Sequence, residues 1–373
     1  MSQLTLPQLY MRLVHLSDIH LSKQNFQEFK NNYRDALLKD LESYHRQKKI
    51  DLLIITGDLI DKGGFSLFDL PEYKDESDPY VIFEKEFIFP IIERIGIDKN
   101  DILFIPGNHD IDENQILWVQ EKKMKSSLKN ETVNGYLNTN HGSFNETNIR
   151  IQKFKEFEKR FHTNNSKYNF SNNQSSYVYT YNAENVGILL VNDSWRCSTC
   201  RIANEEEGHF FGVQQLYDGL EELKKYDPIF NICLFHHSLN DFREKDEVKR
   251  VLHQSSIGLV LFGHYHTTAF FNFYEPYGSC KMIRGRTALN KPDEINAAFK
   301  PGYQIIDFDL GAGRIQQIHF RKYQYAQTSF VGDTDIAPSN GVDSGEVDSS
   351  FFTLNMIKKS QSPVFNINDF KVD

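Results

Sequence analysis

A chain of 373 residues, 39% of them hydrophobic, can bury a sizeable core, which excludes an intrinsically disordered protein. Its formal net charge of −9 repels nucleic acid at long range, so any nucleic-acid contact requires a local basic patch. No apolar stretch approaches the roughly 18 residues that span a bilayer, and the N-terminal residues lack the pattern of a secretory signal. We therefore expect a cytoplasmic protein without a membrane segment.

Five short apolar runs resemble buried strands: Met11–Leu16, Asp51–Thr56, Ile102–Pro106, Ile229–Phe235 and Ile257–Phe262. Three segments between them look helical: Asn25–Lys48, Pro79–Ile95 and Val213–Tyr226. Pro90 should kink the second of these helices. Strands that alternate with helices indicate an α/β sheet covered on its faces, and a further strand at Val186–Val191 fits the same layer.

After residue 266 the pattern changes to strands alone: Thr268–Tyr274, Cys280–Arg284, Tyr303–Phe308 and Arg314–Phe320. Gly-Ala-Gly at 311–313 is a turn signal between the last two. This change predicts a second sheet that packs on the first.

Two regions do not fit a minimal domain. Residues 111–180 are polar and rich in Asn and Lys, and they are far longer than an ordinary loop. They include a basic stretch, Lys122–Lys129, and a charged helical stretch, Ile149–Phe161. Residues 326–373 carry Gly, Ser, Asp and Pro with little periodicity, as in a linker or C-terminal tail. We therefore predict a main domain over residues 10–325 with an insertion at 111–180, followed by a tail that could lead to a further domain or a partner protein.

The four cysteines, Cys197, Cys200, Cys233 and Cys280, are too few and too scattered for a disulfide scaffold. Cys197 and Cys200 form a C-x-x-C, which alone could be a redox pair, half of a zinc site or a pair without a role. No second C-x-x-C or nearby H-x-x-x-H completes a zinc site, so we favour the interpretation without a role.

Every one of the five apolar runs ends in potential metal ligands. In chain order these are Asp18-Ile19-His20, Gly57-Asp58, Gly107-Asn108-His109-Asp110, His236-His237 and Gly263-His264-Tyr265-His266. Ligands bind beyond the carboxyl ends of the strands in open α/β sheets, so these groups would come together from positions about 250 residues apart. In an extended segment residues i and i+2 point the same way, so both members of a D-x-H or H-x-H pair can face one centre.

The types of ligand indicate the kind of metal. Asp and His with one Asn amide form a mixed nitrogen and oxygen set without thiolate, which suits Mn, Fe, Zn, Co or Ni. A single Asp can bridge two ions, and such a pair clamps both oxygens of an in-line displacement. Two divalent cations exceed the charge of two carboxylates and a bridging hydroxide by about one unit, which attracts a phosphate oxygen. We expect two bound divalent ions, and Mn is the metal we favour.

The motifs D-x-H, G-D-x-x-D, G-N-H-D, H-H and G-H-x-H occur here in the order typical of the calcineurin-like metallophosphoesterases, and the chain resembles that family over roughly residues 10–325. The resemblance implies an α/β fold of four layers, an α/β/β/α sandwich in which two mixed β-sheets are flanked by helices. It also implies the role of each ligand: one metal takes Asp18, His20 and His266, the other takes Asn108, His236 and His264, and Asp58 bridges them. His109 would be the catalytic histidine, Asp110 would orient its ring, and Asp61 would support the site from behind.

The chain departs from the family pattern at two positions. Ser238 follows the H-H where relatives often have Pro, which leaves His237 as an alternative to His236. Lys62 stands where the protein Ser/Thr phosphatases have Arg, and Lys cannot replace a bidentate phosphate clamp. The difference favours the branch of cyclic-nucleotide phosphodiesterases and repair exonucleases.

We therefore predict a dinuclear metal-dependent phosphoesterase, acting foremost on phosphodiesters of nucleotides or nucleic acid by in-line attack of a metal-bridging hydroxide. The alternatives are a phosphomonoesterase and a catalytic effector or scaffold module of a larger protein. A nuclease would need residues 111–180 to form a basic groove that carries aromatic side chains.

Other residues with possible chemistry are assigned structural roles. These are the histidines His15, His141, His162, His209 and His253. Arg196 could touch a substrate phosphate, but an ordinary surface arginine is the interpretation we favour.

Overall fold

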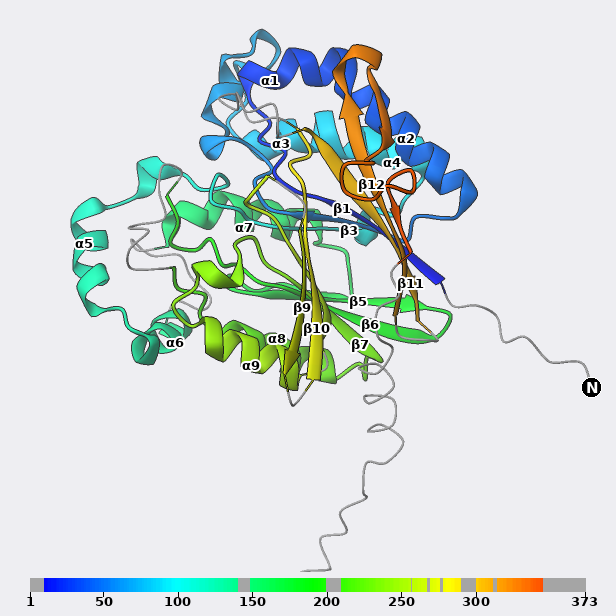
Figure 1. Cartoon of the computed structure of the whole chain (residues 1–373). Helices are drawn as coiled ribbons and strands as arrows, with labels where there is room; N and C mark the ends of the chain where they lie inside the picture. Colours follow the sequence, from blue (N-terminus) through cyan, green and yellow to red (C-terminus); the bar gives the residue numbers. More distant parts are fainter. Residues whose placement is uncertain are drawn as a thin grey trace, which may run out of the picture.

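The computed structural model describes residues 10–139, 148–198, 209–255, 257–266, 269–275, 278–289, 300–310 and 314–344. Two β-sheets lie face to face, and helices cover the outer face of each (Figure 1). Both sheets contain parallel and antiparallel pairs. The four-layer α/β/β/α sandwich with two mixed sheets is therefore confirmed.

The first sheet has the strand order β13-β12-β11-β1-β2-β3, and β14 pairs with β12. Its strands are β1 (Tyr10–Leu16), β2 (Leu52–Thr56), β3 (Ile102–Ile105), β11 (Gly302–Asp309), β12 (Arg314–Gln324), β13 (Ser329–Gly332) and β14 (Val342–Asp343). β1, β2 and β3 are parallel, so their carboxyl ends meet at one edge of the sandwich.

The second sheet has the order β4-β5-β6-β7-β8-β10-β9. Its strands are β4 (Tyr168–Asn169), β5 (Ser175–Tyr181), β6 (Glu184–Leu190), β7 (Phe230–Leu234), β8 (Ile257–Phe262), β9 (Ala269–Glu275) and β10 (Gly278–Arg284). The neighbours β6, β7, β8 and β10 are parallel.

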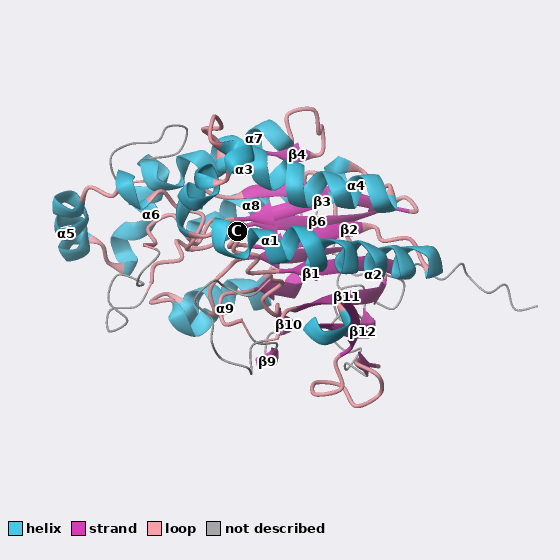
Figure 2. Ribbon diagram, turned by 90° about the horizontal axis from the view of Figure 1, so that it is seen from above, coloured by secondary structure: helices cyan, strands magenta, loops and turns pink. Residues whose placement is uncertain are grey.

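Helices cover the outer faces of both sheets. Over the first sheet lie α1 (Lys23–Glu28), α2 (Arg34–Gln47), α3 (Pro79–Phe83), α4 (Phe89–Ile95) and α7 (Gln152–Phe161), as Figure 2 shows from above. Over the second lie α8 (Gln214–Lys224) and α9 (Lys245–Gln254). The predicted helix at Pro79–Ile95 is interrupted by a π-helical turn, Glu84–Ile88, directly before the turn that contains Pro90.

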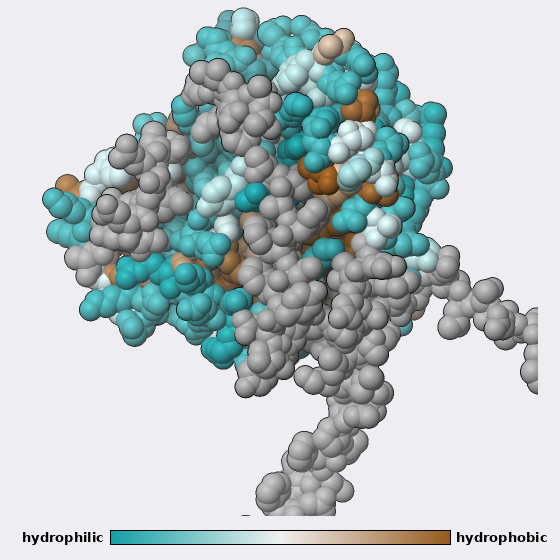
Figure 3. Space-filling model, viewed as in Figure 1, coloured by the Kyte–Doolittle hydropathy of each residue, from teal (hydrophilic) through white to brown (hydrophobic). Residues whose placement is uncertain are grey.

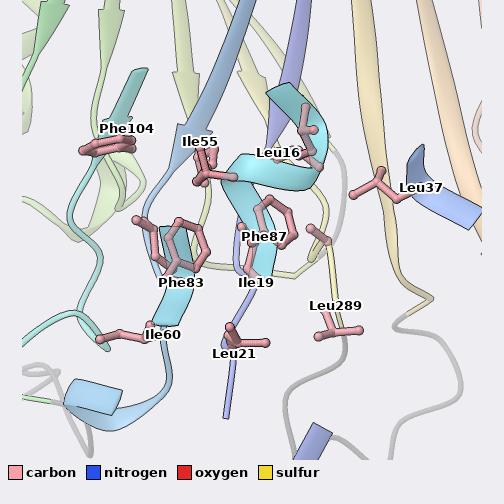
Figure 4. Packing of buried hydrophobic residues seen from close by; sticks show 14 of the residues in the cluster. Leu16, Ile19, Leu21, Leu37, Ile55, Ile60, Phe83, Phe87, Phe104 and Leu289 are labelled. Atoms are coloured by element: carbon pink, nitrogen blue, oxygen red, sulfur yellow. The ribbon is translucent and has the colours of Figure 1, made fainter. Parts of the chain in front are cut away.

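The period-two alternation of the strands builds a separate core on each face of the first sheet. In β1, Leu13 lies in the core between the sheets, whereas Leu16 packs under the helices. Figure 4 shows Leu16 and Ile55 beside Phe83 and Phe87 of the helical layer. Burial of one such side chain contributes about 1.5–3 kcal/mol, so two cores formed from one set of strands hold three layers together.

The division of strands between the sheets differs from the prediction. The sequence suggested that the early strands form one sheet and the late strands the other. Instead, β11 and β12 pair beside β1, whereas β6, β7 and β8 join β10 and β9. Strands buried on both faces have similar apolar sequences, so composition does not reveal which sheet a strand joins.

Elements of the sandwich also occur in the two regions that the sequence set apart. Within the predicted insertion 111–180, α7 packs on the first sheet and β5 belongs to the second. Among the described residues of this region, α5 (Trp118–Ser127) and α6 (Asn130–Thr139) form an arm, seen at one end of the sandwich in Figure 1. Beyond residue 326, β13 and β14 extend the first sheet where a linker or tail was expected. The predicted turn at 311–313, His141, Cys200 and residues 345–373 lie outside the described residues.

The surface in the view of Figure 3 is mostly hydrophilic over the described residues, with small hydrophobic groups among them. None of the described helices combines the length and the apolar character that crossing a membrane requires.

Candidate metal centre

The predicted ligands lie where strands of both sheets end. Asp18 and His20 follow β1, Asp58 follows β2 and Asn108 follows β3, all from the first sheet. The second sheet contributes His236 after β7, and His264 and His266 after β8. The structure brings all seven side chains together, so the centre spans the seam between the two sheets.

Asp18, His20 and His266 form the first group of donors. Nε2 of His20 lies 3.2 Å from Nε2 of His266 and 3.9 Å from Oδ1 of Asp18, and the third side of this triangle is 3.6 Å. Donors bound at about 2.0–2.1 Å to one tetrahedral ion would lie roughly 3.3 Å apart. The triangle is therefore close to the size that a single divalent ion requires.

Asn108, His236 and His264 form the second group. Oδ1 of Asn108 lies 3.2 Å from Nε2 of His236 and 3.1 Å from Nδ1 of His264. Oδ2 of Asp58 lies between the two groups, 3.4 Å from Nε2 of His236 and 3.6 Å from Nε2 of His20. One carboxylate oxygen thus faces both groups, which is the position that a bridging ligand takes.

The geometry favours His236 over His237 as the ligand after β7. Nδ1 of His236 donates to the carbonyl oxygen of Thr56 at 2.8 Å, which directs Nε2 toward Asp58. Nδ1 of His237 instead contacts Asp193, and its Nε2 faces Cys197.

The donors fit a pair of divalent cations. Oδ1 of Asp18 is buried without a hydrogen-bond partner, and burial raises the pKa of this carboxyl group. Burial alone would lower the pKa of His236, but the carboxylate of Asp58 raises it to about 10. Such buried polar groups are costly unless a charge or a metal compensates them. The mixed nitrogen and oxygen set suits Mn, Fe, Zn, Co or Ni.

Five of the seven predicted ligands have a left-handed backbone conformation. The φ angles are 52° at Asp18, 49° at His20, 54° at Asp58, 74° at His264 and 55° at His266. For residues other than glycine this conformation costs about 1 kcal/mol or more each. The chain therefore accepts backbone strain at the positions where side chains turn from the strand ends toward one centre.

Asp61, and not Asp110, contacts the ring of His109. Oδ1 of Asp61 accepts a hydrogen bond from Nδ1 of His109 at 2.7 Å. The carboxylate of Asp110 instead accepts backbone N–H groups, from Gly107 at 2.8 Å and from Leu59 at 3.1 Å. The prediction that Asp110 orients the ring is therefore corrected: Asp110 ties together the loops after β2 and β3.

Asp193 is a residue of the site that the sequence did not reveal. Its Oδ1 accepts the backbone N–H of His236 at 3.0 Å. Its Oδ2 accepts the backbone N–H of His237 at 2.8 Å and lies 2.9 Å from Nδ1 of the same residue. Asp193 follows β6, a strand that the sequence predicts, so its place after a strand end is the signal in the sequence that points to it.

Two motif glycines are required by close approach to ligands. A Cβ atom on Gly107 would lie 2.2 Å from Oδ1 of Asp58, and one on Gly57 would lie 2.4 Å from Nδ1 of His236. The glycines that precede Asp58 and Asn108 thus let the loops pack directly on the ligands.

Arg196 neither lies at the surface nor faces the donor groups. Its side chain is buried, and its Nε donates to Oε1 of Glu121 in α5 at 2.7 Å. Arg150 pairs with the same carboxylate, so the two arginines attach the arm of α5 and α6 to the segment after β6.

The sequence is similar to that of a curated bacterial protein. The chain is 28% identical over 273 residues to the uncharacterized metallophosphoesterase-like protein YydB of Bacillus subtilis (strain 168), and the match covers 70% of this chain and 50% of that protein. The chain thus spans about half the length of this curated relative.

Two solved structures resemble the fold. One is a 5'-nucleotidase precursor from Thermus thermophilus, with a TM-score of 0.44 and 11% identity over 95% of this chain and 59% of that one. The other is the Haemophilus influenzae NAD nucleotidase (NadN), with a TM-score of 0.44 and 13% identity over 95% of this chain and 56% of that one. At such TM-scores neither carries a conclusion about substrate. A model of the Calcineurin-like phosphoesterase family matches residues 11–268. The chain belongs to the calcineurin-like phosphoesterase family.

Proposed function

We propose that the chain is a cytoplasmic phosphoesterase that uses two divalent metal ions to hydrolyse phosphodiesters of nucleotides or nucleic acid. The observation that carries this proposal is the position of Oδ2 of Asp58, within 3.6 Å of a donor of each group. One shared oxygen between two complete donor sets supports a paired centre rather than two unrelated sites.

Bound ions would supply positive charge for the phosphoryl oxygens and acidify a water nucleophile. The residues of the chain then divide the remaining tasks. Asp58 holds the two donor sets in register, and its Oδ1 accepts the backbone N–H of His109 at 2.7 Å. Because Nδ1 of His109 bonds to Asp61, proton transfer to a leaving oxygen has to run through Nε2.

The centre opens toward solvent on one side. Asp18, His20, Asp58 and His236 are buried, whereas His264 and His266 are half-buried and Tyr265 is exposed. The guanidinium of Arg284 lies 5.2 Å from the Tyr265 ring, which places a cation at this side. An anionic ester would therefore approach along a favourable potential.

One feature supports a diester over a monoester. Lys62 replaces the Arg of the protein phosphatases, so the chain lacks that bidentate clamp for a terminal phosphate. His109 offers a proton donor, which the basic alkoxide leaving group of either class of ester requires. The arm supplies exposed Trp118, Lys122 and Lys129, which suit stacking and phosphate contacts if the diester is nucleic acid.

A substrate panel tests the proposal. Protein stripped with a chelator and reloaded with Mn is assayed on cyclic nucleotides, single-stranded DNA, RNA and phosphomonoesters. We expect turnover of at least one diester class that chelation abolishes, Mn restores and Asp58→Asn removes. Asp35→Asn alters an exposed carboxylate on α2 and serves as the matched control. Turnover confined to monoesters would refute the diester proposal, and activity that survives chelation would refute the metal centre.

A further inference from the structure

A second cluster of metal-ligating side chains lies outside the two donor groups. Cys197, His209 and His237 are 1%, 5% and 0% exposed, respectively. Cys197 comes from the segment after β6 and His237 follows β7, whereas His209 belongs to a short stretch that bridges to Phe242. The sequence indicated no partner for Cys197 because these histidines lie 12 and 40 residues away along the chain.

The distances within the cluster match a tetrahedral metal site. Sγ of Cys197 lies 3.6 Å from Nε2 of His209 and 3.7 Å from Nε2 of His237. A zinc ion with a sulfur at about 2.3 Å and nitrogens at about 2.0–2.1 Å has sulfur–nitrogen edges of roughly 3.6 Å. The side chains thus already lie at the separation that an ion between them would impose.

Asp193 fixes the ring of His237 in the orientation that a ligand needs. Oδ2 of Asp193 lies 2.9 Å from Nδ1 of His237, so the ring proton resides on Nδ1 and the lone pair of Nε2 points toward Cys197. A carboxylate behind a metal-bound histidine is the usual arrangement that sets the tautomer. Nε2 of His209 also contacts the main-chain oxygen of Asp193, and a metal would compete with this contact.

The backbone around the cluster is held independently of any metal. The N–H of His209 donates to Asp241 at 2.8 Å, and its carbonyl accepts from Arg243 at 2.9 Å. The N–H of Cys197 donates to Ser194 at 3.0 Å, and its carbonyl accepts from Nη1 of Arg150 at 3.0 Å. The ligand positions are therefore organised before an ion arrives, which lowers the cost of binding.

We propose that Cys197, His209 and His237 bind a third metal ion, a zinc, beside the paired centre. A thiolate with two imidazoles favours zinc, in contrast to the thiolate-free donors of the pair. Three side chains leave a fourth position for water or another donor. The ion would join the segment after β6, which carries Asp193, to the end of β7, which carries His236. It would thereby hold in place the loop that supports one ligand of the pair.

Metal analysis and cobalt spectroscopy of the whole chain test this proposal. We expect tightly bound zinc in the wild type that survives the chelation that removes the pair. The cobalt-substituted protein should show a sulfur-to-cobalt charge-transfer band in the near ultraviolet. Cys197→Ser should lose both signals, and Cys233→Ser, which changes another buried thiol, should keep both. Asp58→Asn should disturb the pair and leave the band intact, so this test is independent of the proposed function.

A cobalt-loaded wild type without a charge-transfer band would overturn the proposal, as would zinc retained by Cys197→Ser. In either case the cluster is a thiol hydrogen-bonded to two imidazoles. Circular dichroism checks the fold of each variant, and His209→Gln provides a second route to loss of the band. The absence of the band in the wild type decides against the proposal even if both variants unfold.

Discussion

Oδ1 of Asp61, in the loop after β2, accepts a hydrogen bond at 2.7 Å from Nδ1 of His109, in the loop after β3. The sequence places Asp110 next to His109, but the adjacent carboxylate points away toward backbone amides. The partner that sets the tautomer therefore comes from the neighbouring loop.

From this contact we predict that the rate lost in His109→Ala depends on the leaving group of the substrate. An alkoxide departs poorly without a proton, whereas a nitrophenolate departs readily. We expect a loss on the order of 10²–10⁴-fold on the alkoxide diester and a visibly smaller loss on the nitrophenyl ester, at unchanged metal content. Asp61→Asn should show the same pattern more mildly. Equal losses on both esters would assign His109 to stabilisation of phosphoryl charge, and loss of metal would make it a ligand.

Asp58→Asn should lose more metal than any variant that affects one donor group. Its Oδ2 faces both groups, whereas Asn108 belongs to the second alone. We expect weaker binding of both ions in Asp58→Asn and of one ion in Asn108→Ala. The measurement is the amount of metal bound per chain after equilibrium dialysis against Mn. Equal stoichiometry in the two variants would contradict the shared position of Asp58.

Asp193→Asn should weaken the ion held by His236 although Asp193 is not a ligand. Its two carboxylate oxygens accept the backbone N–H groups of His236 and His237. An amide in its place would keep one oxygen but point its NH₂ group at the other N–H. Loss of such a supporting group costs about 10–100-fold in metal affinity, which a competition titration with a chromophoric chelator measures. Asp98→Asn is the matched control, because this side chain caps a turn and asparagine caps as well. An unchanged titration in Asp193→Asn would show that the loop holds itself.

Gly107→Ala should destabilise the protein and impair metal binding together. The new methyl group would lie 2.2 Å from Oδ1 of Asp58 and 2.4 Å from its backbone nitrogen, so the bridging carboxylate has to move. Overpacking of this kind costs about 1–3 kcal/mol in the free energy of unfolding, measurable by urea denaturation. Gly135→Ala in α6 meets no atom within 4 Å and should stabilise by up to ~1 kcal/mol. Equal effects of the two substitutions would refute the steric argument.

His15 should make the metal-free protein less stable as the pH falls. Its ring bridges Gln304 and Thr56, and burial lowers its pKa to about 4 from 6.5. The unfolded chain therefore takes up a proton at a higher pH than the folded chain, and protonation favours unfolding below about pH 6.5. Its contribution amounts to about 2 kcal/mol between pH 7 and pH 5. Urea denaturation at both pH values should show a smaller drop in His15→Gln, and an identical drop would contradict the shift.

The sequence predicted the strands that precede the ligands because each is a short apolar run, and a motif at a strand end is local information. The sequence did not reveal that β11 lies beside β1, because pairing across some 290 residues leaves no local signal. The same limit explains the site. The structure brings together all seven predicted ligands, whereas Asp193 and the true partner of His109 depend on how separate loops pack.

Regions of low periodicity were the other source of error. The predicted tail contains β13, four residues long, and β14, two residues long. Such short edge strands take their conformation from β12, their partner, rather than from an apolar pattern of their own. The helix at Ile149–Phe161 follows from its charged pattern, whereas its aromatic side chains, including Phe154 and Phe157, make it part of the core.

The seam between the two sheets has a consequence for how the protein responds to change far from its active centre. Each donor group draws residues from both sheets, so the distances within each group depend on the thickness of the apolar layer that separates β1 and β2 from β7 and β8. Leu13, Ile54, Ile232 and Leu261 in that layer act as spacers. Replacing one of them with a smaller residue would let the sheets slide or tilt. The donor side chains would then shift, although the replaced residue contacts neither metal nor substrate. The interior of the sandwich thus controls the geometry of the donor groups. Substitutions there can change that geometry while every predicted ligand stays in place.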